Sequence, residues 1–120
     1  MSKKTRVLIV EDDEAIRYGT RLRLETRDYT VSTAIDGCDG LQQIRADQPD
    51  VILMDIRMPN MDGLTALAEL KADPTTSEIP VIIASASLGD KTTALDIGAK
   101  YFLCKPYSND ALFAVVDSSL

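Results

Sequence analysis

Short apolar runs alternate with amphipathic stretches along this chain. The runs at residues 7–10, 51–54, 81–84 and 101–104 are rich in β-branched or aromatic side chains, which is typical of strands covered on both faces. Residues 29–34 alternate less regularly and predict an edge strand. Apolar residues at helical spacing predict a helix after each strand, with these buried stripes: Ile16, Gly19, Leu22 and Thr26; Leu41 and Ile44; Leu64, Leu67, Ala68 and Leu70; Ala94, Leu95 and Ile97; Leu112, Val115 and Val116.

The alternation of strands and helices predicts an α/β fold. Parallel strands need right-handed helical crossovers, so we expect a doubly wound, five-stranded parallel sheet with helices on both faces. The expected strand order is 2-1-3-4-5, the flavodoxin-like arrangement, with residues 1–120 as one domain. Ligands of such sheets bind at the carboxyl ends of the strands beside the point where the order reverses. Functional residues are therefore expected just after residues 10 and 54.

Composition narrows the range of functions. The net charge of −6 argues against nonspecific binding to nucleic acid or to an anionic membrane. The absence of histidine excludes an imidazole base, a zinc-binding histidine and a phosphohistidine relay within the chain. The apolar runs are too short for a signal peptide or a membrane span, and Cys38 and Cys104 form no Cys-x-x-Cys motif. We expect a cytoplasmic protein without a membrane partner.

Polar side chains follow the central strands at one edge of the predicted sheet. Glu11 and Asp12 follow the first strand and Asp55 the third, so their carboxylates converge and favour a hard divalent cation such as Mg²⁺. The next two strands end in Ser85 and Lys105, a hydroxyl and an ammonium suited to a phosphoryl group beside that cation. Asp55 can itself act as the nucleophile.

Four ordered motifs resemble the receiver domain of two-component response regulators, of the kind seen in the single-domain chemotaxis regulator. They are residues 7–13 (VLIVEDD), residues 50–63 (DVILMDIRMPNMDG), residues 79–86 (IPVIIASA) and residues 98–106 (GAKYFLCKP). The resemblance covers almost the whole chain and implies a phosphoprotein that signals within a two-component phosphorelay.

The resemblance implies a role for each matching residue. Asp55 is the phosphoacceptor, Asp12 and Asp55 bind Mg²⁺ directly, Glu11 binds it through water, and the backbone carbonyl of Arg57 is a further ligand. By the same resemblance, Ser85 is the hydroxyl that contacts the phosphoryl group, the backbone of Ala86 is a further donor, and Lys105 is the lysine that pairs with the phosphoryl oxygens. Phe102 is the switch aromatic, and the peptide bond between Lys105 and Pro106 is cis.

Two of these positions depart from the usual pattern. Phe102 stands where the family most often has tyrosine, so it lacks a hydroxyl to fix either rotamer, and it can equally be read as a core strand residue. Arg57 lies two residues after the nucleophile. It is either a solvated loop arginine or a side chain that covers an aspartyl phosphate against attacking water.

The resemblance also implies partners. The phosphodonor is a sensor histidine kinase or a histidine phosphotransfer protein, or a small acyl phosphate, because this chain has no histidine. A downstream effector protein reads the face formed by the fourth helix, fifth strand and fifth helix, including Lys100, Phe102 and Tyr107. No output domain and no nucleic-acid-binding motif is expected in residues 1–120.

Two other functions stay open at this point. The first is a phosphorylation-independent adaptor that keeps the fold without the switch. The second is a Mg²⁺-dependent phosphohydrolase with an aspartate nucleophile, although Arg57 stands where such enzymes place a second aspartate. We otherwise expect no enzyme activity beyond slow self-phosphorylation from acyl phosphates and slow self-dephosphorylation.

Overall fold

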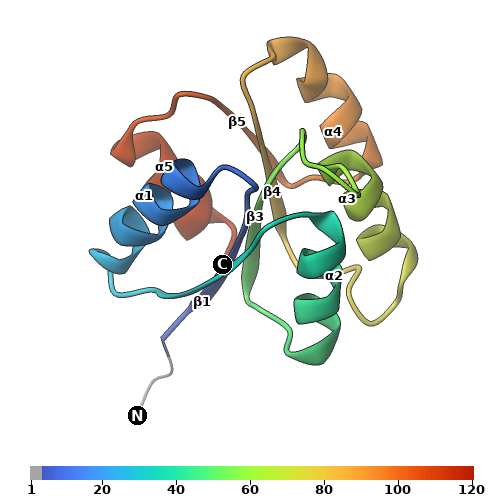
Figure 1. Cartoon of the computed structure of the whole chain (residues 1–120), viewed down its shortest axis with the longest axis horizontal. Coiled ribbons are helices and arrows are strands. Elements are labelled where there is room, and N and C mark those ends of the chain that lie inside the picture. Colours follow the sequence, from blue (N-terminus) through green and yellow to red (C-terminus); the bar gives the residue numbers. More distant parts are fainter. Residues whose placement is uncertain (1–3) are drawn as a thin grey trace.

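The computed structural model describes residues 4–120, which alternate strands and helices as the sequence predicts (Figure 1). The elements in chain order are β1 (Arg6–Val10), α1 (Glu14–Glu25), β2 (Thr30–Ala34), α2 (Gly37–Ala46), β3 (Val51–Asp55), α3 (Gly63–Ala72), β4 (Val81–Ser85), the 3₁₀ turn η1 (Leu88–Asp90), α4 (Lys91–Ile97), β5 (Tyr101–Cys104) and α5 (Asn109–Ser118).

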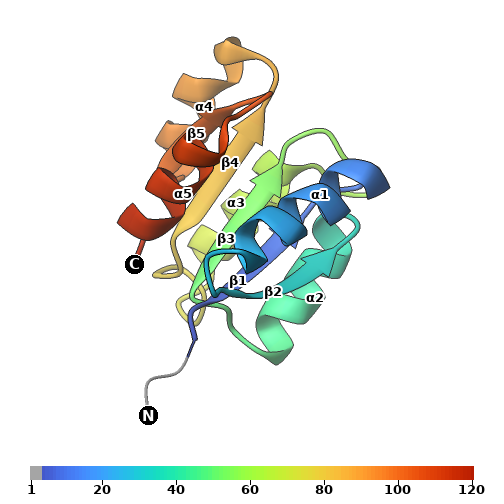
Figure 2. The same ribbon diagram turned by 90° about the vertical axis from the view of Figure 1, so that its left-hand side faces the viewer.

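Within the described residues the strands form one five-stranded sheet of order β2-β1-β3-β4-β5. All four pairings are parallel, and Val10 lies opposite Met54 where β1 meets β3. Helices α1 and α5 cover one face, seen in front of the sheet in Figure 2, and α2, α3 and α4 cover the other. The predicted fold class, strand order and edge position of β2 are confirmed.

The sheet separates two apolar layers. Successive residues of a strand point to opposite faces, so Leu8, Ile52 and Ile83 pack toward α2, α3 and α4. Ile9 and Leu53, which adjoin two of these in sequence, pack toward α1 and α5. Because both faces are covered, β1, β3, β4 and β5 are apolar at nearly every position, and their polar side chains appear only at the strand ends. The edge strand β2 differs, with Ser32 and Thr33 in its interior.

The buried face of α1 differs from the predicted stripe. Ile16 and Leu22 are 41% and 46% exposed, whereas Thr20 and Leu24 are 3% and 0% exposed. Thr20 tolerates burial because its hydroxyl hydrogen-bonds the Tyr107 hydroxyl at 3.3 Å. Apolar periodicity could not find this face, because a tertiary hydrogen bond allows a polar residue to occupy it.

Helix termini carry residue types that satisfy or end the helical backbone. Asp13 accepts a hydrogen bond from the Ile16 backbone N–H at the start of α1, and Ser108 accepts one from Ala111 at the start of α5. Gly98 ends α4 with a φ of 131°, a conformation that favours glycine. Among residues 4–120, no helix is long and apolar enough to cross a membrane.

Candidate functional site at the carboxyl edge of the sheet

Three carboxylates meet where β1 and β3 end. Glu11 and Asp12 follow β1 and Asp55 ends β3, and one oxygen from each lies within 4.8 Å of the others. Glu11 is buried, Asp55 is half-buried and Asp12 is exposed. The Arg17 guanidinium donates to the backbone carbonyls of Glu11 and Asp12 at 3.0 and 3.3 Å, which holds the β1–α1 loop in place. The site is therefore a small acidic depression that opens to solvent at Asp12.

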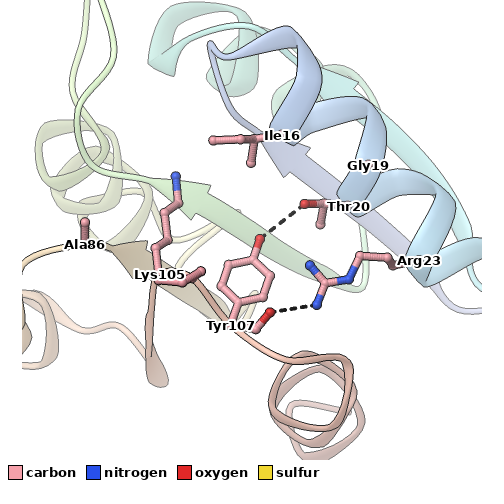
Figure 3. Close-up of a pocket in the computed structure, with 8 residues that line it drawn as sticks. Ile16, Gly19, Thr20, Arg23, Ala86, Lys105 and Tyr107 are labelled. Carbon is pink, nitrogen blue, oxygen red and sulfur yellow. Dashed lines mark hydrogen bonds between the residues drawn. The ribbon is translucent and has the colours of Figure 1, made fainter.

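Lys105 enters this depression from the end of β5. Its Nζ atom lies 2.7 Å from Glu11 Oε1 and 3.2 Å from Asp55 Oδ1, and the Lys105 side chain is only 16% exposed. Figure 3 shows the side chain extending to the carboxyl end of β3. The Ile56 backbone N–H also donates to Asp55 Oδ1, at 2.9 Å. Two donors thus hold one oxygen of Asp55, while the other carboxylate oxygen remains for a ligand.

One ammonium does not balance the acidic residues around it. Burial raises the pKa of Glu11, the hydrogen bond from Lys105 opposes this rise, and the charge of Asp55 adds to it. Burial alone would lower the pKa of Lys105, but the hydrogen bond to Glu11 and the charges of Asp55 and Glu11 raise it. Lys105 therefore stays protonated, and its single positive charge faces three carboxyl groups.

These residues fit a hard divalent cation. All the ligand atoms offered by Glu11, Asp12 and Asp55 are carboxylate oxygens, the donors that Mg²⁺ prefers. A depression of about 400 Å³ opens beside them, lined by Asp12 and by the loop after β3, including Arg57. The excess of carboxyl groups over ammonium groups at the site gives a cation an electrostatic reason to bind.

The other residues predicted for the site lie around this depression. Ser85 ends β4 and is 3% exposed, and Ala86 is exposed directly after it. Phe102 is half-buried against the apolar layer on the α3 and α4 side. The peptide bond between Lys105 and Pro106 is cis. The Arg57 side chain is 76% exposed and points to Asp90, 3.6 Å away, instead of covering Asp55.

Sequence reasoning missed the residues that anchor the β3–α3 loop. The Asp36 side chain accepts hydrogen bonds from the Asp39 backbone N–H and from the Asn60 side-chain amide, each at 2.8 Å. Asn60 has a φ of 67°, and the Gly37 N–H donates to the Met61 carbonyl at 3.2 Å. An asparagine in a turn was the available signal, because asparagine tolerates positive φ. The start of α2 therefore fixes the loop that carries Arg57.

Replacing Asp36 with alanine is expected to lower the free energy of unfolding by about 1–2 kcal/mol at neutral pH. The Asp39 N–H and the Asn60 amide lower the pKa of Asp36 in the folded chain. This stabilisation is present above the unfolded pKa and is lost as the pH falls through the folded value. Urea unfolding at pH 7 and near pH 3 would measure the difference. The difference in unfolding free energy between wild type and Asp36→Ala should shrink at the lower pH. Asp96→Ala, on the exposed face of α4, is the control and should change stability little at either pH.

A groove of about 430 Å³ adjoins the site between α1 and the β5–α5 loop (Figure 3). Tyr107 lines this groove, and its hydroxyl hydrogen-bonds the Thr20 hydroxyl. The Arg23 guanidinium lies 5.1 Å from the Tyr107 ring centroid and donates to the Tyr107 carbonyl at 2.8 Å. Ile16 and Lys105 also line the groove. Ile16, which was predicted to be buried, therefore belongs to a surface next to the acidic depression.

The fold and this arrangement of charges define the class of protein, and comparison with known sequences agrees. Residues 7–117 match the Response regulator receiver domain family. The chain belongs to that family. It is 44% identical over 115 residues to the response regulator PleD of Caulobacter vibrioides. This match covers 94% of this chain and 25% of PleD. Response regulator MprA of Mycobacterium ulcerans is 36% identical over 91% of this chain and 47% of its own length.

Solved structures show the same fold. Chemotaxis protein CheY4 of Vibrio cholerae superposes with a TM-score of 0.90 at 27% identity, covering 98% of this chain and 100% of that chain. The receiver domain of a Pseudomonas aeruginosa sensor histidine kinase superposes with a TM-score of 0.89 at 27% identity, covering 98% of each chain, and holds a magnesium ion in its active site cleft. The chain spans about a quarter to a half of the length of the curated relatives that it matches.

Proposed function

We propose that this chain is a phosphoacceptor module of a two-component phosphorelay, with Asp55 as the residue that is phosphorylated. The observation that carries the proposal is the position of Asp55: it ends a central strand, one of its oxygens is held by Lys105 and by the Ile56 N–H, and Glu11 and Asp12 stand beside it. A carboxylate oriented in this way is suited to attack phosphorus in line.

The residues divide the work of phosphoryl transfer. The free oxygen of Asp55 attacks phosphorus, the bond to the donor's imidazole nitrogen breaks, and the electron pair leaves with that nitrogen. Asp12, Asp55 and the Arg57 carbonyl would hold Mg²⁺, with Glu11 acting through water; when bound, the ion supplies positive charge that stabilises the transferring phosphoryl group. Lys105 pairs with phosphoryl oxygens, and Ser85 and the Ala86 backbone N–H donate hydrogen bonds to them.

The partners follow from the surfaces around the site. A histidine kinase or histidine phosphotransfer protein would approach over the groove beside Lys105, where the exposed Ile16 gives an apolar contact. A downstream effector would read α4, β5 and α5, where Leu95 is 39% exposed and Phe102 is half-buried. Phosphorylation would bias that face through Ser85 and Phe102.

Intact mass after incubation with acetyl phosphate and Mg²⁺ tests this function. We expect the wild type to gain one phosphoryl group. Asp55→Asn should abolish the gain because an amide lacks the nucleophilicity and charge of a carboxylate. Chelation should abolish it because the cation that stabilises the transferring group is removed. No gain in a folded protein that binds Mg²⁺, together with a partner that binds wild type and Asp55→Ala equally, would favour the adaptor. Multiple turnover of a phosphomonoester would favour the phosphohydrolase.

Replacing Arg57 with alanine is expected to shorten the lifetime of the phosphorylated state by roughly twofold to tenfold. The side chain is long, exposed and cationic, so it can turn from Asp90 to the phosphoryl group and obstruct attacking water. Loss of the phosphoryl group with time, followed by intact mass, measures the effect. Arg45→Ala on α2 removes the same charge away from the site and should leave the decay rate unchanged. An equal decay rate for Arg57→Ala and wild type would contradict the role.

A further inference from the structure

Asp90 holds two groups at the mouth of the site. Its Oδ2 atom accepts a hydrogen bond from the Ser85 hydroxyl at 2.8 Å, and the Arg57 guanidinium lies 3.6 Å from the same oxygen. Asp90 ends the η1 turn, and its side chain is only 22% exposed. One carboxylate thus contacts both the hydroxyl assigned to the phosphoryl group and the arginine beside the nucleophile.

The hydrogen-bonding capacity of Ser85 is already used. A serine hydroxyl has one hydrogen to donate, and Ser85 donates it to Asp90 while its oxygen accepts the Ser87 backbone N–H at 3.1 Å. Ser85 is 3% exposed, so water does not readily replace either partner. Before it can donate to a phosphoryl oxygen, the hydroxyl must leave Asp90.

We propose that Asp90 is a positioning residue that competes with the phosphoryl group for the Ser85 hydroxyl and so opposes the phosphorylated arrangement. The proposal rests on the proposed phosphoacceptor function. An interaction that is made only in the unmodified chain must be broken when the phosphoryl group is held. The free energy of that interaction is therefore subtracted from the affinity for the phosphoryl oxygens. A hydrogen bond to a charged carboxylate is stronger than one between neutral groups, which makes this competition effective.

Two effects of Asp90 must be separated. Its negative charge opposes any anion at the site, whereas its hydrogen bond acts only through Ser85. A double-mutant cycle between Asp90→Ala and Ser85→Ala isolates the second effect. Asp96→Ala removes a charge from the exposed face of α4 and serves as the control for the first.

The readout is the affinity for beryllofluoride, a mimic of the phosphoryl group, measured by calorimetry at saturating Mg²⁺. We expect Asp90→Ala to bind the mimic roughly threefold to tenfold more tightly than wild type. The gain should disappear in the Ser85→Ala background, and Asp96→Ala should bind as the wild type does. A merely structural role for Asp90 would not tighten binding.

Each remaining outcome is decisive. Unchanged or weaker binding by Asp90→Ala, or a gain that persists without the Ser85 hydroxyl, would overturn the proposal and leave the phosphoacceptor function intact. Failure of the wild type to bind beryllofluoride would contradict both. If Asp90→Ala does not fold, Asp90→Asn in the same cycle replaces a charged acceptor with a neutral one and should give a smaller gain that still depends on Ser85.

Discussion

Replacing Gly63 with alanine is expected to destabilise the fold by about 3–5 kcal/mol or to prevent folding. A Cβ atom at Gly63 would lie 2.0 Å from the Asp55 carbonyl oxygen and 3.0 Å from the Ile56 Cα atom. All of these are backbone atoms, and the Gly63 N–H donates to the Ile56 carbonyl at 2.7 Å. No rotamer change can relieve such a clash, so the end of β3 and the start of α3 must separate.

Urea unfolding would measure this effect, with Gly19→Ala as the matched control. A Cβ atom at Gly19 meets nothing within 4 Å in the middle of α1. The same added methyl group should therefore stabilise that helix by about 0.5–1 kcal/mol. If Gly63→Ala unfolded within 1 kcal/mol of the wild type, the loop backbone would have to be far more adaptable than its contacts indicate.

Replacing Lys105 with methionine is expected to cost about 3 kcal/mol of stability in buffer without divalent cations. The substitution leaves Glu11 and Asp55 facing each other without the ammonium that lies 2.7 and 3.2 Å from them. It also removes the hydrogen bond that lowers the pKa of Glu11, so that pKa should rise further. A raised carboxyl pKa means stability that is present at low pH and lost as the pH rises. The deficit should therefore be larger at pH 7 than at pH 4.

Magnesium should affect the Lys105→Met variant more than the wild type. The Lys105 ammonium repels a cation that binds the same group of carboxylates, so without it the apparent Mg²⁺ affinity should rise by roughly tenfold, or about 1.4 kcal/mol. Thermal unfolding at a series of Mg²⁺ concentrations would measure it. Lys100→Met, in the exposed turn before β5, should behave as the wild type. Equal Mg²⁺ affinities in Lys105→Met and wild type would mean that the ammonium does not oppose binding of the cation.

Sequence reasoning could predict the features that depend on strand order. Glu11 and Lys105 are separated by 94 positions, yet parallel strands deliver both to the same edge, so their proximity follows from topology alone. The caps at Asp13 and Ser108 were predictable because each depends on a local hydrogen bond. The strand runs were predictable because burial on both faces removes polar residues from them.

Features set by tertiary contacts could not be predicted. Burial of Thr20 depends on the Tyr107 hydroxyl, which comes from a loop 87 positions away. The contact between Asp90 and Ser85 depends on how the η1 turn brings the carboxylate back to the strand end. Several carboxylates lie in loops near the site, and spacing alone does not say which of them faces the serine.

The alternation along β5 places adjacent aromatic residues in separate layers. Tyr101 packs on the α1 and α5 side of the sheet, and Phe102 packs on the α3 and α4 side. The chain contains no tryptophan, so a single tryptophan at either position would be an unambiguous fluorescence reporter. The two positions would report separately on opposite sides of the sheet, and a spectral change confined to one of them would assign a motion to that side.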